Sequence, residues 1–119
     1  MTNTYILDKM ISMFGAVLVT GARQVGKTTL LKQCKPEYSY VSLDDINELS
    51  IAKEDSMLFM KEHAAPVIID EIQYAPSLFP TIKLIIDKEN ISGQFLMSGS
   101  QFKRYSGMTP GEFRKLTML

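Results

Sequence analysis

The amino-acid sequence predicts an α/β fold in which layers of helices cover a mostly parallel sheet of about four strands. Two observations lead to this fold class. Short apolar runs alternate along the chain with segments whose apolar residues recur at helical spacing. The run at residues 66–70 is continuously apolar up to its aspartate, as is typical of a strand inside a parallel sheet. With 119 residues, the chain is long enough for one domain.

The first half of the chain is predicted to hold two strands among several helices. The run at residues 16–20 is short, apolar and bounded by glycines, which indicates a buried strand. Asp44 and Asp45 follow the second strand, and their carboxylates are suited to cap a helix. The elements predicted here are a helix at 4–13, a strand at 16–20, a helix from 26 to about 33, a strand at 38–43 and a helix from about 55 to 63.

The second half repeats the alternation with two more strands. Residues 66–70 and 94–98 are the predicted strands, and residues 77–88 form a helix between them. Pro80 falls in the first turn of that helix, where its missing N–H group does little harm. Ligands of parallel sheets bind at the carboxyl ends of the strands, so we expect the functional residues there.

The stretch from Gly21 to Thr28 matches the pattern G-x-x-x-x-G-K-[ST] in full, between a predicted strand and a predicted helix. Glycines at the two fixed positions let the backbone turn tightly and approach an anion. Successive N–H groups and the start of the helix then attract phosphate. The sequence therefore predicts the three-layer core of a P-loop NTPase. The residues expected around the phosphates are Gly21, Ala22, Arg23, Gln24, Val25, Gly26, Lys27, Thr28 and Thr29.

Four side chains are expected to carry the chemistry of a bound nucleotide. Lys27 supplies a positive charge to the β- and γ-phosphates, and the Thr28 hydroxyl is a ligand for Mg²⁺. The third strand ends in Asp70, which is predicted to hold Mg²⁺ through water, and Glu71 is placed to orient or deprotonate the attacking water. No Asn-Lys-x-Asp element for reading guanine occurs, so the predicted ligands are ATP and Mg²⁺.

Other polar residues are weaker candidates. Ser98 closes the fourth strand and completes the predicted catalytic set with Lys27 and Glu71, unless it belongs to an ordinary turn. Gln73 either reports the state of the nucleotide or is a surface residue. His63 has no second histidine, cysteine or carboxylate cluster at metal-ligand spacing, which predicts a histidine at a helix end.

Charge, hydropathy and cysteine content disfavour a nucleic-acid-binding or membrane protein and suit a cytoplasmic one. The net charge is zero, and residues 1–100 hold 9 basic and 12 acidic groups. A nucleic-acid binder would have a basic main body, so nucleic acid is not an expected partner. No apolar run approaches the ~20 residues that span a bilayer, so no membrane association is expected. Cys34 is the only cysteine, which suits the cytoplasm.

From Gly15 to Ser100, the sequence resembles a prokaryotic AAA-type ATPase family whose members carry a C-terminal domain of unknown function. The resemblance implies an ATP-binding core with Mg²⁺, a catalytic glutamate at Glu71 and a first sensor at Ser98. Members continue past residue 101 with a fifth strand and with arginines that complete the site. Residues 1–101 are therefore expected to be a core that is incomplete at its C-terminus. The matching stretches are residues 18–31, 41–45, 66–76, 78–83 and 95–101.

Residues 102–119 are set apart in the sequence as a short basic tail, with four basic residues against one acidic residue. Residues 102–115 are similar to the final turns of AraC-type transcription regulators, where Phe-x-x-x-x-Gly-x-Thr-Pro-x-x-Phe/Tyr-Arg closes the second helix-turn-helix. The alternative is coincidence in a basic tail.

Three functions stay open at this point. The first is an ATPase, completed by an arginine from a homo-oligomer or a protein partner, because such arginines are worth ~10³–10⁵ in rate. The second is an inactive nucleotide-binding remnant or interaction module, favoured by the missing C-terminal residues. The third is DNA contact through the basic tail, which the acidic main body disfavours. A small-molecule kinase would need a lid and an acceptor pocket, for which the sequence shows no sign.

Overall fold

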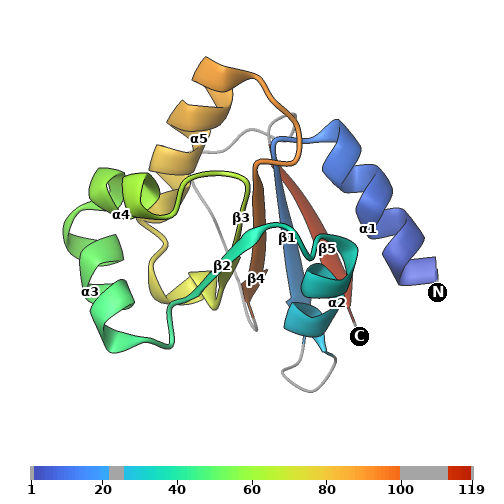
Figure 1. The fold of residues 1–119 in the computed structure, drawn as a ribbon, viewed down its shortest axis with the longest axis horizontal. Coiled ribbons are helices and arrows are strands. Elements are labelled where there is room, and N and C mark those ends of the chain that lie inside the picture. The colour runs from blue at the N-terminus through green and yellow to red at the C-terminus, as the bar shows by residue number, and fades with distance from the viewer. Residues whose placement is uncertain (1, 22–25, 100–112, 119) are drawn as a thin grey trace.

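The computed structural model describes residues 2–21, 26–99 and 113–118 of the chain. Its centre is a five-stranded sheet in the order β2-β3-β4-β1-β5, in which every pair of neighbours is parallel (Figure 1). The α/β fold class with a parallel sheet is thereby confirmed. The strands are β1 (Ala16–Gly21), β2 (Ser39–Ser42), β3 (Val67–Asp70), β4 (Phe95–Gly99) and β5 (Phe113–Met118).

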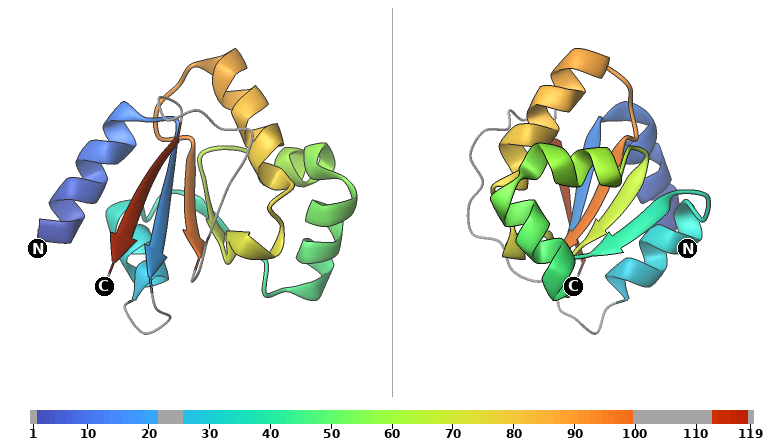
Figure 2. Two further views of the ribbon diagram at one scale, coloured as in Figure 1. Left: turned by 180° about the vertical axis from the view of Figure 1, so that it is seen from behind. Right: turned by 60° about the vertical axis from the view of Figure 1, so that its left-hand side comes forward.

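Helices cover both faces of this sheet, which gives three layers (Figures 1 and 2). One face carries α1 and α2, and the other carries α3, α4 and α5. The helices are α1 (Thr2–Met13), α2 (Lys27–Cys34), α3 (Ile46–Glu54), α4 (Ser56–Glu62) and α5 (Leu78–Glu89), with a short 3-10 turn, η2 (Ile72–Tyr74), after β3.

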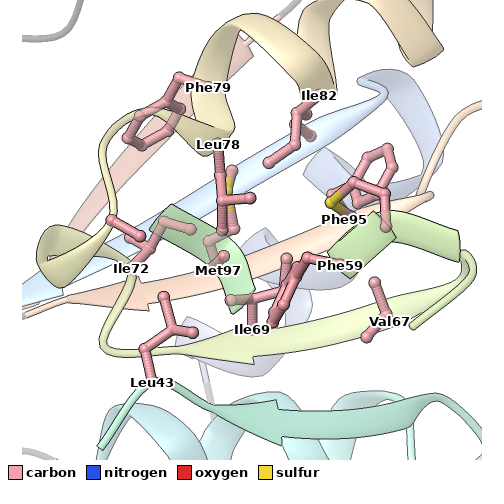
Figure 3. Close-up of a cluster of buried hydrophobic side chains, with 14 of the residues drawn as sticks. Leu43, Phe59, Val67, Ile69, Ile72, Leu78, Phe79, Ile82, Phe95 and Met97 are labelled. Atoms are coloured by element: carbon pink, nitrogen blue, oxygen red, sulfur yellow. The ribbon is translucent and has the colours of Figure 1, made fainter. Parts of the chain in front are cut away.

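The side chains of β1, β3 and β4 point alternately into two apolar clusters, one on each face of the sheet. In β1, Ala16 and Leu18 join the larger cluster under α3, α4 and α5, whereas Val17 and Val19 join the smaller cluster under α1 and α2. Phe59 lies in the larger cluster with no exposed surface (Figure 3). Burial on both faces explains why β1, β3 and β4 begin with continuous apolar runs rather than with alternating apolar and polar residues.

Two aspartates begin the helices that follow β2. The Asp45 carboxylate accepts hydrogen bonds from the N–H groups of Asn47 and Glu48, at 2.9 and 3.3 Å, and so caps α3. The Asp55 carboxylate accepts one from the Leu58 N–H group at 3.0 Å and caps α4. The predicted capping role is therefore confirmed for Asp45, and α3 is the helix that it begins.

The sheet contains one strand more than the sequence predicts. β5 comes from the segment that the sequence sets apart as a basic tail, and it pairs in parallel with β1 from Phe113 opposite Ala16 to Met118 opposite Gly21. Arg114 and Lys115 place two charges side by side, a pattern that favoured a solvated tail over a strand. Strand pairing uses backbone groups, so an open edge of β1 accepts this segment despite its charges.

Within the described parts of the chain, no helix combines the length and the apolar character that crossing a membrane would require.

Leu18 is fully buried in β1 and provides a test of this core. Replacing it with alanine removes three carbon atoms and leaves a cavity, so we expect Leu18→Ala to lower the free energy of unfolding by about 2–5 kcal/mol. Leu84→Ala is the matched control, because Leu84 is 66% exposed on α5, and its loss should change stability by at most about 0.5 kcal/mol. Urea unfolding of both variants checks this, and equal midpoints would contradict the described core.

Candidate functional site

The carboxyl ends of β1, β3 and β4 lie at one edge of the sheet, because all three strands are parallel neighbours. Each motif singled out in the sequence falls at one of these ends. Gly21 ends β1, Asp70 ends β3 and Ser98 is the penultimate residue of β4. A cavity of about 180 Å³ opens at this edge, which is room for a phosphate group. The residues that line it are Gly26, Lys27, Thr28, Thr29, Asp70 and Glu71.

The two fixed glycines of the phosphate-loop pattern have backbone conformations that side chains disfavour. Gly21 has a φ of 145° and Gly26 a φ of 74°, and Gly26 is the residue from which α2 starts. A Cβ at Gly26 would meet no described atom within 4 Å, so the backbone angle rather than crowding requires glycine there. Ala22, Arg23, Gln24 and Val25 lie outside the described residues.

Lys27 is the first residue of α2 and is buried despite its charge, with 6% of its surface exposed. Its Nζ donates a hydrogen bond to the Gly21 carbonyl oxygen at 3.0 Å. The lysine side chain therefore folds back toward Gly21, with its ammonium group beside the end of β1. An ammonium held there is a ready counter-charge for an anion that enters the cavity.

Three hydroxyl groups converge on the buried carboxylate of Asp70. Oδ2 accepts hydrogen bonds from Thr28 Oγ1 at 2.9 Å and from the Tyr40 hydroxyl at 2.8 Å. Oδ1 accepts a hydrogen bond from Ser98 Oγ. The donors come from α2, β2 and β4, so one carboxylate joins three elements that are distant in sequence.

Ser98 is fully buried, and its hydroxyl is engaged within the protein. Besides donating to Asp70, Ser98 Oγ accepts a hydrogen bond from the Glu71 N–H group at 3.4 Å. In this arrangement the serine forms hydrogen bonds with the two acidic residues, Asp70 and Glu71. The sequence instead predicts that it contacts the γ-phosphate or the attacking water.

Glu71 has a left-handed backbone, with a φ of 60° and a ψ of 45°, and it lies directly after β3. Such a conformation costs of order 1 kcal/mol in a residue with a side chain and concentrates at functional sites. The Glu71 carboxylate accepts a hydrogen bond from Gln73 Nε2 at 2.7 Å. Gln73, rated in the sequence as no better than a surface residue, thus contacts the predicted catalytic glutamate.

Tyr40 belongs to the site, although the sequence places it only in a strand. Burial, followed by the hydrogen bond and the charge of Asp70, raises the pKa of Tyr40 to about 12. The phenol is therefore neutral at physiological pH and remains a donor to Asp70. The alternation of β2 puts Tyr40 on the face opposite Val41, which is the signal that would have directed it toward α2.

His63 is closer to carboxylates than its sequence context indicates. Its Nε2 lies 2.7 Å from Glu48 Oε1, and the ligand atoms of Glu48, Glu62 and His63 all fall within 4.8 Å of one another. Glu48 comes from α3, fifteen residues away, so metal-ligand spacing along the chain could not reveal it. The ring of His63 also packs against Phe59, with 4.7 Å between centroids, and its position after α4 confirms the predicted helix-end histidine.

The oxygen donors at the edge of the sheet fit a hard divalent cation. The Thr28 hydroxyl and the Asp70 carboxylate meet beside the phosphate-sized cavity, and Mg²⁺ prefers such ligands together with phosphate oxygens. Among the described residues, this is also the place where a buried lysine, a helix N-terminus and two acidic residues coincide. The arrangement is suited to bind a phosphate ester with its metal ion.

Comparison with known proteins agrees with this geometry. The family model described as an AAA domain matches residues 14–118, which includes β5. Two uncharacterized mycobacterial proteins, Mb2031c of Mycobacterium bovis and Rv2008c of Mycobacterium tuberculosis, are each 34% identical to the chain over 87 residues. The match covers 71% of this chain but 19% of each relative, so the chain spans a small part of their length. The AraC-type similarity finds no support. The chain belongs to the AAA domain family.

Proposed function

We propose that this domain binds ATP with Mg²⁺ and hydrolyses it. The observation that carries the proposal is the 2.9 Å hydrogen bond from Thr28 Oγ1 to Asp70 Oδ2. It brings the end of the phosphate-loop pattern against the acidic end of β3, 42 residues along the chain. A hydroxyl and a carboxylate so joined can bind one Mg²⁺ together, the first directly and the second through water.

In the proposed reaction, residues of the chain mainly position groups and offset charge. Lys27 Nζ leaves the Gly21 carbonyl and donates to the β- and γ-phosphate oxygens, while N–H groups at the start of α2 bind the same phosphates. Mg²⁺, when bound, offsets the negative charge that develops on the transferring phosphoryl group. Asp70 stays fixed by its three hydroxyl partners throughout, so its carboxylate needs no reorganisation during the reaction.

Glu71 is the proposed general base. Its left-handed backbone directs the residue out of the line of β3, and the adjacent cavity is the place where its carboxylate would meet a water molecule. The hydrogen bond from Gln73 restrains the carboxylate, and its release would free an oxygen to accept a proton from the water. The proton moves from water to Glu71 as the water oxygen attacks the γ-phosphorus and the bond to the leaving ADP oxygen breaks.

We also propose that the domain acts in the cytoplasm and with a protein partner. An arginine from a second copy of the chain or from a protein partner would complete the charge on the γ-phosphate. ATP and a single cysteine, Cys34, both suit the cytoplasm. An inactive nucleotide-binding module is the alternative, and turnover of ATP by the chain distinguishes the two.

Lys27→Ala tests the phosphate contact. Because a charged hydrogen bond is worth about 1.5–3 kcal/mol, we expect this variant to weaken ATP binding by about 10- to 100-fold in isothermal titration. Lys83→Ala is the matched control, since Lys83 pairs with Asp87 at 2.8 Å on α5, outside the proposed site, and it should bind ATP as the parent does. Equal affinity in both variants would remove Lys27 from the proposal.

Glu71→Gln tests the general base. The amide keeps the size of the side chain but accepts no proton, so we expect ATP hydrolysis to fall by about 10²–10⁴-fold while ATP affinity is retained. Release of phosphate and titration with ATP measure the two quantities. A parent chain that binds ATP without turnover, even at high protein concentration, would favour the inactive module instead.

A further inference from the structure

Tyr40 lies on the edge strand β2, yet it reaches the centre of the proposed site. In the register of β2 with β3, Tyr40 is opposite Ile68 and Ser42 is opposite Asp70. Its hydroxyl nevertheless lies 2.8 Å from Asp70 Oδ2, so the side chain extends along the strand direction toward the carboxyl end of the sheet. Tyr40 is part of neither the phosphate-loop pattern nor the acidic end of β3, so neither motif predicts its place in the site.

A cation from α2 holds the ring of Tyr40. Lys32 Nζ lies 3.8 Å from the centroid of the ring, within the range of a cation–π interaction. Lys32 is four residues after Thr28, so the two side chains lie on one face of α2. Thr28 contacts the Asp70 carboxylate, and Lys32 contacts the tyrosine that binds the same carboxylate oxygen.

The donors to Asp70 leave the carboxylate little freedom. A carboxylate offers about four acceptor sites, and Thr28, Tyr40 and Ser98 fill two on Oδ2 and one on Oδ1. Thr28 is also the residue expected to bind the cation, which makes Tyr40 the donor on Oδ2 that is not itself a proposed ligand. Loss of the phenol would leave Oδ2 with the threonine as its sole described donor.

We propose that Tyr40 is a positioning residue for the divalent cation, acting by fixing the orientation of the Asp70 carboxylate, with Lys32 holding the tyrosine ring in place. The inference rests on the proposed binding of ATP with Mg²⁺. Groups that orient a residue next to a metal ion commonly change metal affinity by 10–100-fold when removed. Tyr40 is 40% exposed, which places the expected effect at the lower end of that range.

The test separates the metal-dependent part of ATP binding from the rest. ATP is titrated into the parent chain and Tyr40→Phe, in EDTA and at a series of Mg²⁺ concentrations. We expect Tyr40→Phe to raise the Mg²⁺ concentration for half-maximal binding about tenfold, with ATP affinity in EDTA unchanged. Saturating Mg²⁺ should restore both binding and turnover, because the phenol contacts neither phosphate nor water in this role.

Tyr38→Phe is the matched control. The Tyr38 hydroxyl donates to the Gly93 carbonyl oxygen at 2.7 Å, so this variant loses a hydrogen bond of similar length away from the site. It should keep the Mg²⁺ dependence of the parent. Lys32→Met keeps an unbranched side chain that is one atom shorter and has no charge, and we expect a smaller shift in the same direction as that of Tyr40→Phe.

Three outcomes overturn the inference. An unchanged Mg²⁺ dependence in Tyr40→Phe means that the phenol does not position Asp70. If Tyr40→Phe weakens ATP binding in EDTA as much as in Mg²⁺, then Tyr40 has only a structural role. The same conclusion follows if Tyr38→Phe shifts the Mg²⁺ dependence as much as Tyr40→Phe does. If the parent chain binds no ATP, with or without Mg²⁺, the proposed function itself is wrong. If the parent and Tyr40→Phe both bind ATP with the same dependence on Mg²⁺, only the role of Tyr40 is wrong.

Discussion

The hydrogen-bonded carboxylate of Asp70 is the constraint on which the site depends. A carboxylate that is 8% exposed is costly to bury unless its oxygens are satisfied, and here three hydroxyl groups satisfy them. Each donor comes from a different element, so the bonds form together only if β2, β3, β4 and α2 are correctly arranged. The strand order β2-β3-β4 supplies that arrangement, because it places Tyr40 and Ser98 on the two sides of Asp70. The carboxylate thus couples the geometry of the site to the topology of the sheet.

The apolar clusters on the two faces of the sheet stabilise the fold and offset the unfavourable free energy of the buried charged and strained residues in the site. Burial of Lys27, the polar groups around Asp70 and the left-handed backbone of Glu71 all disfavour the folded state. Apolar burial contributes roughly 25 cal/mol per Å², and side chains such as Phe59 and Ile69 are entirely removed from solvent (Figure 3). Lys27, Asp70 and Glu71 gather at the carboxyl ends of the strands, whereas the central residues of β1, β3 and β4 are apolar. This division lets the strand ends serve binding without weakening the core.

The sequence predicts features that depend on neighbouring residues better than features that depend on contacts across the fold. The phosphate-loop pattern, the strand before Asp70 and the cap at Asp45 are local, and each has a physical cause within a few residues. Tyr40 and Glu48 were missed because their partners, Asp70 and His63, are 30 and 15 residues away and meet them only after the elements pack. Ser98 was identified by its place at a strand end, but its engagement with Asp70 and Glu71 required the register of β3 with β4.

β5 contributes to the site indirectly, because it pairs with β1, the strand that leads into the phosphate-loop pattern. In a four-stranded sheet without β5, β1 would be an edge strand with one row of unpaired backbone groups, open to pairing with another chain. With β5 present, β1 is paired on both sides from Ala16 to Thr20, and Gly21 pairs with Met118 of β5. Gly21 is also the residue whose carbonyl oxygen accepts the hydrogen bond from Lys27. β5 therefore pairs with the residue of β1 to which the Lys27 ammonium group binds. The family match that continues to residue 118 is consistent with this role, since it includes the strand that supports the start of the phosphate loop.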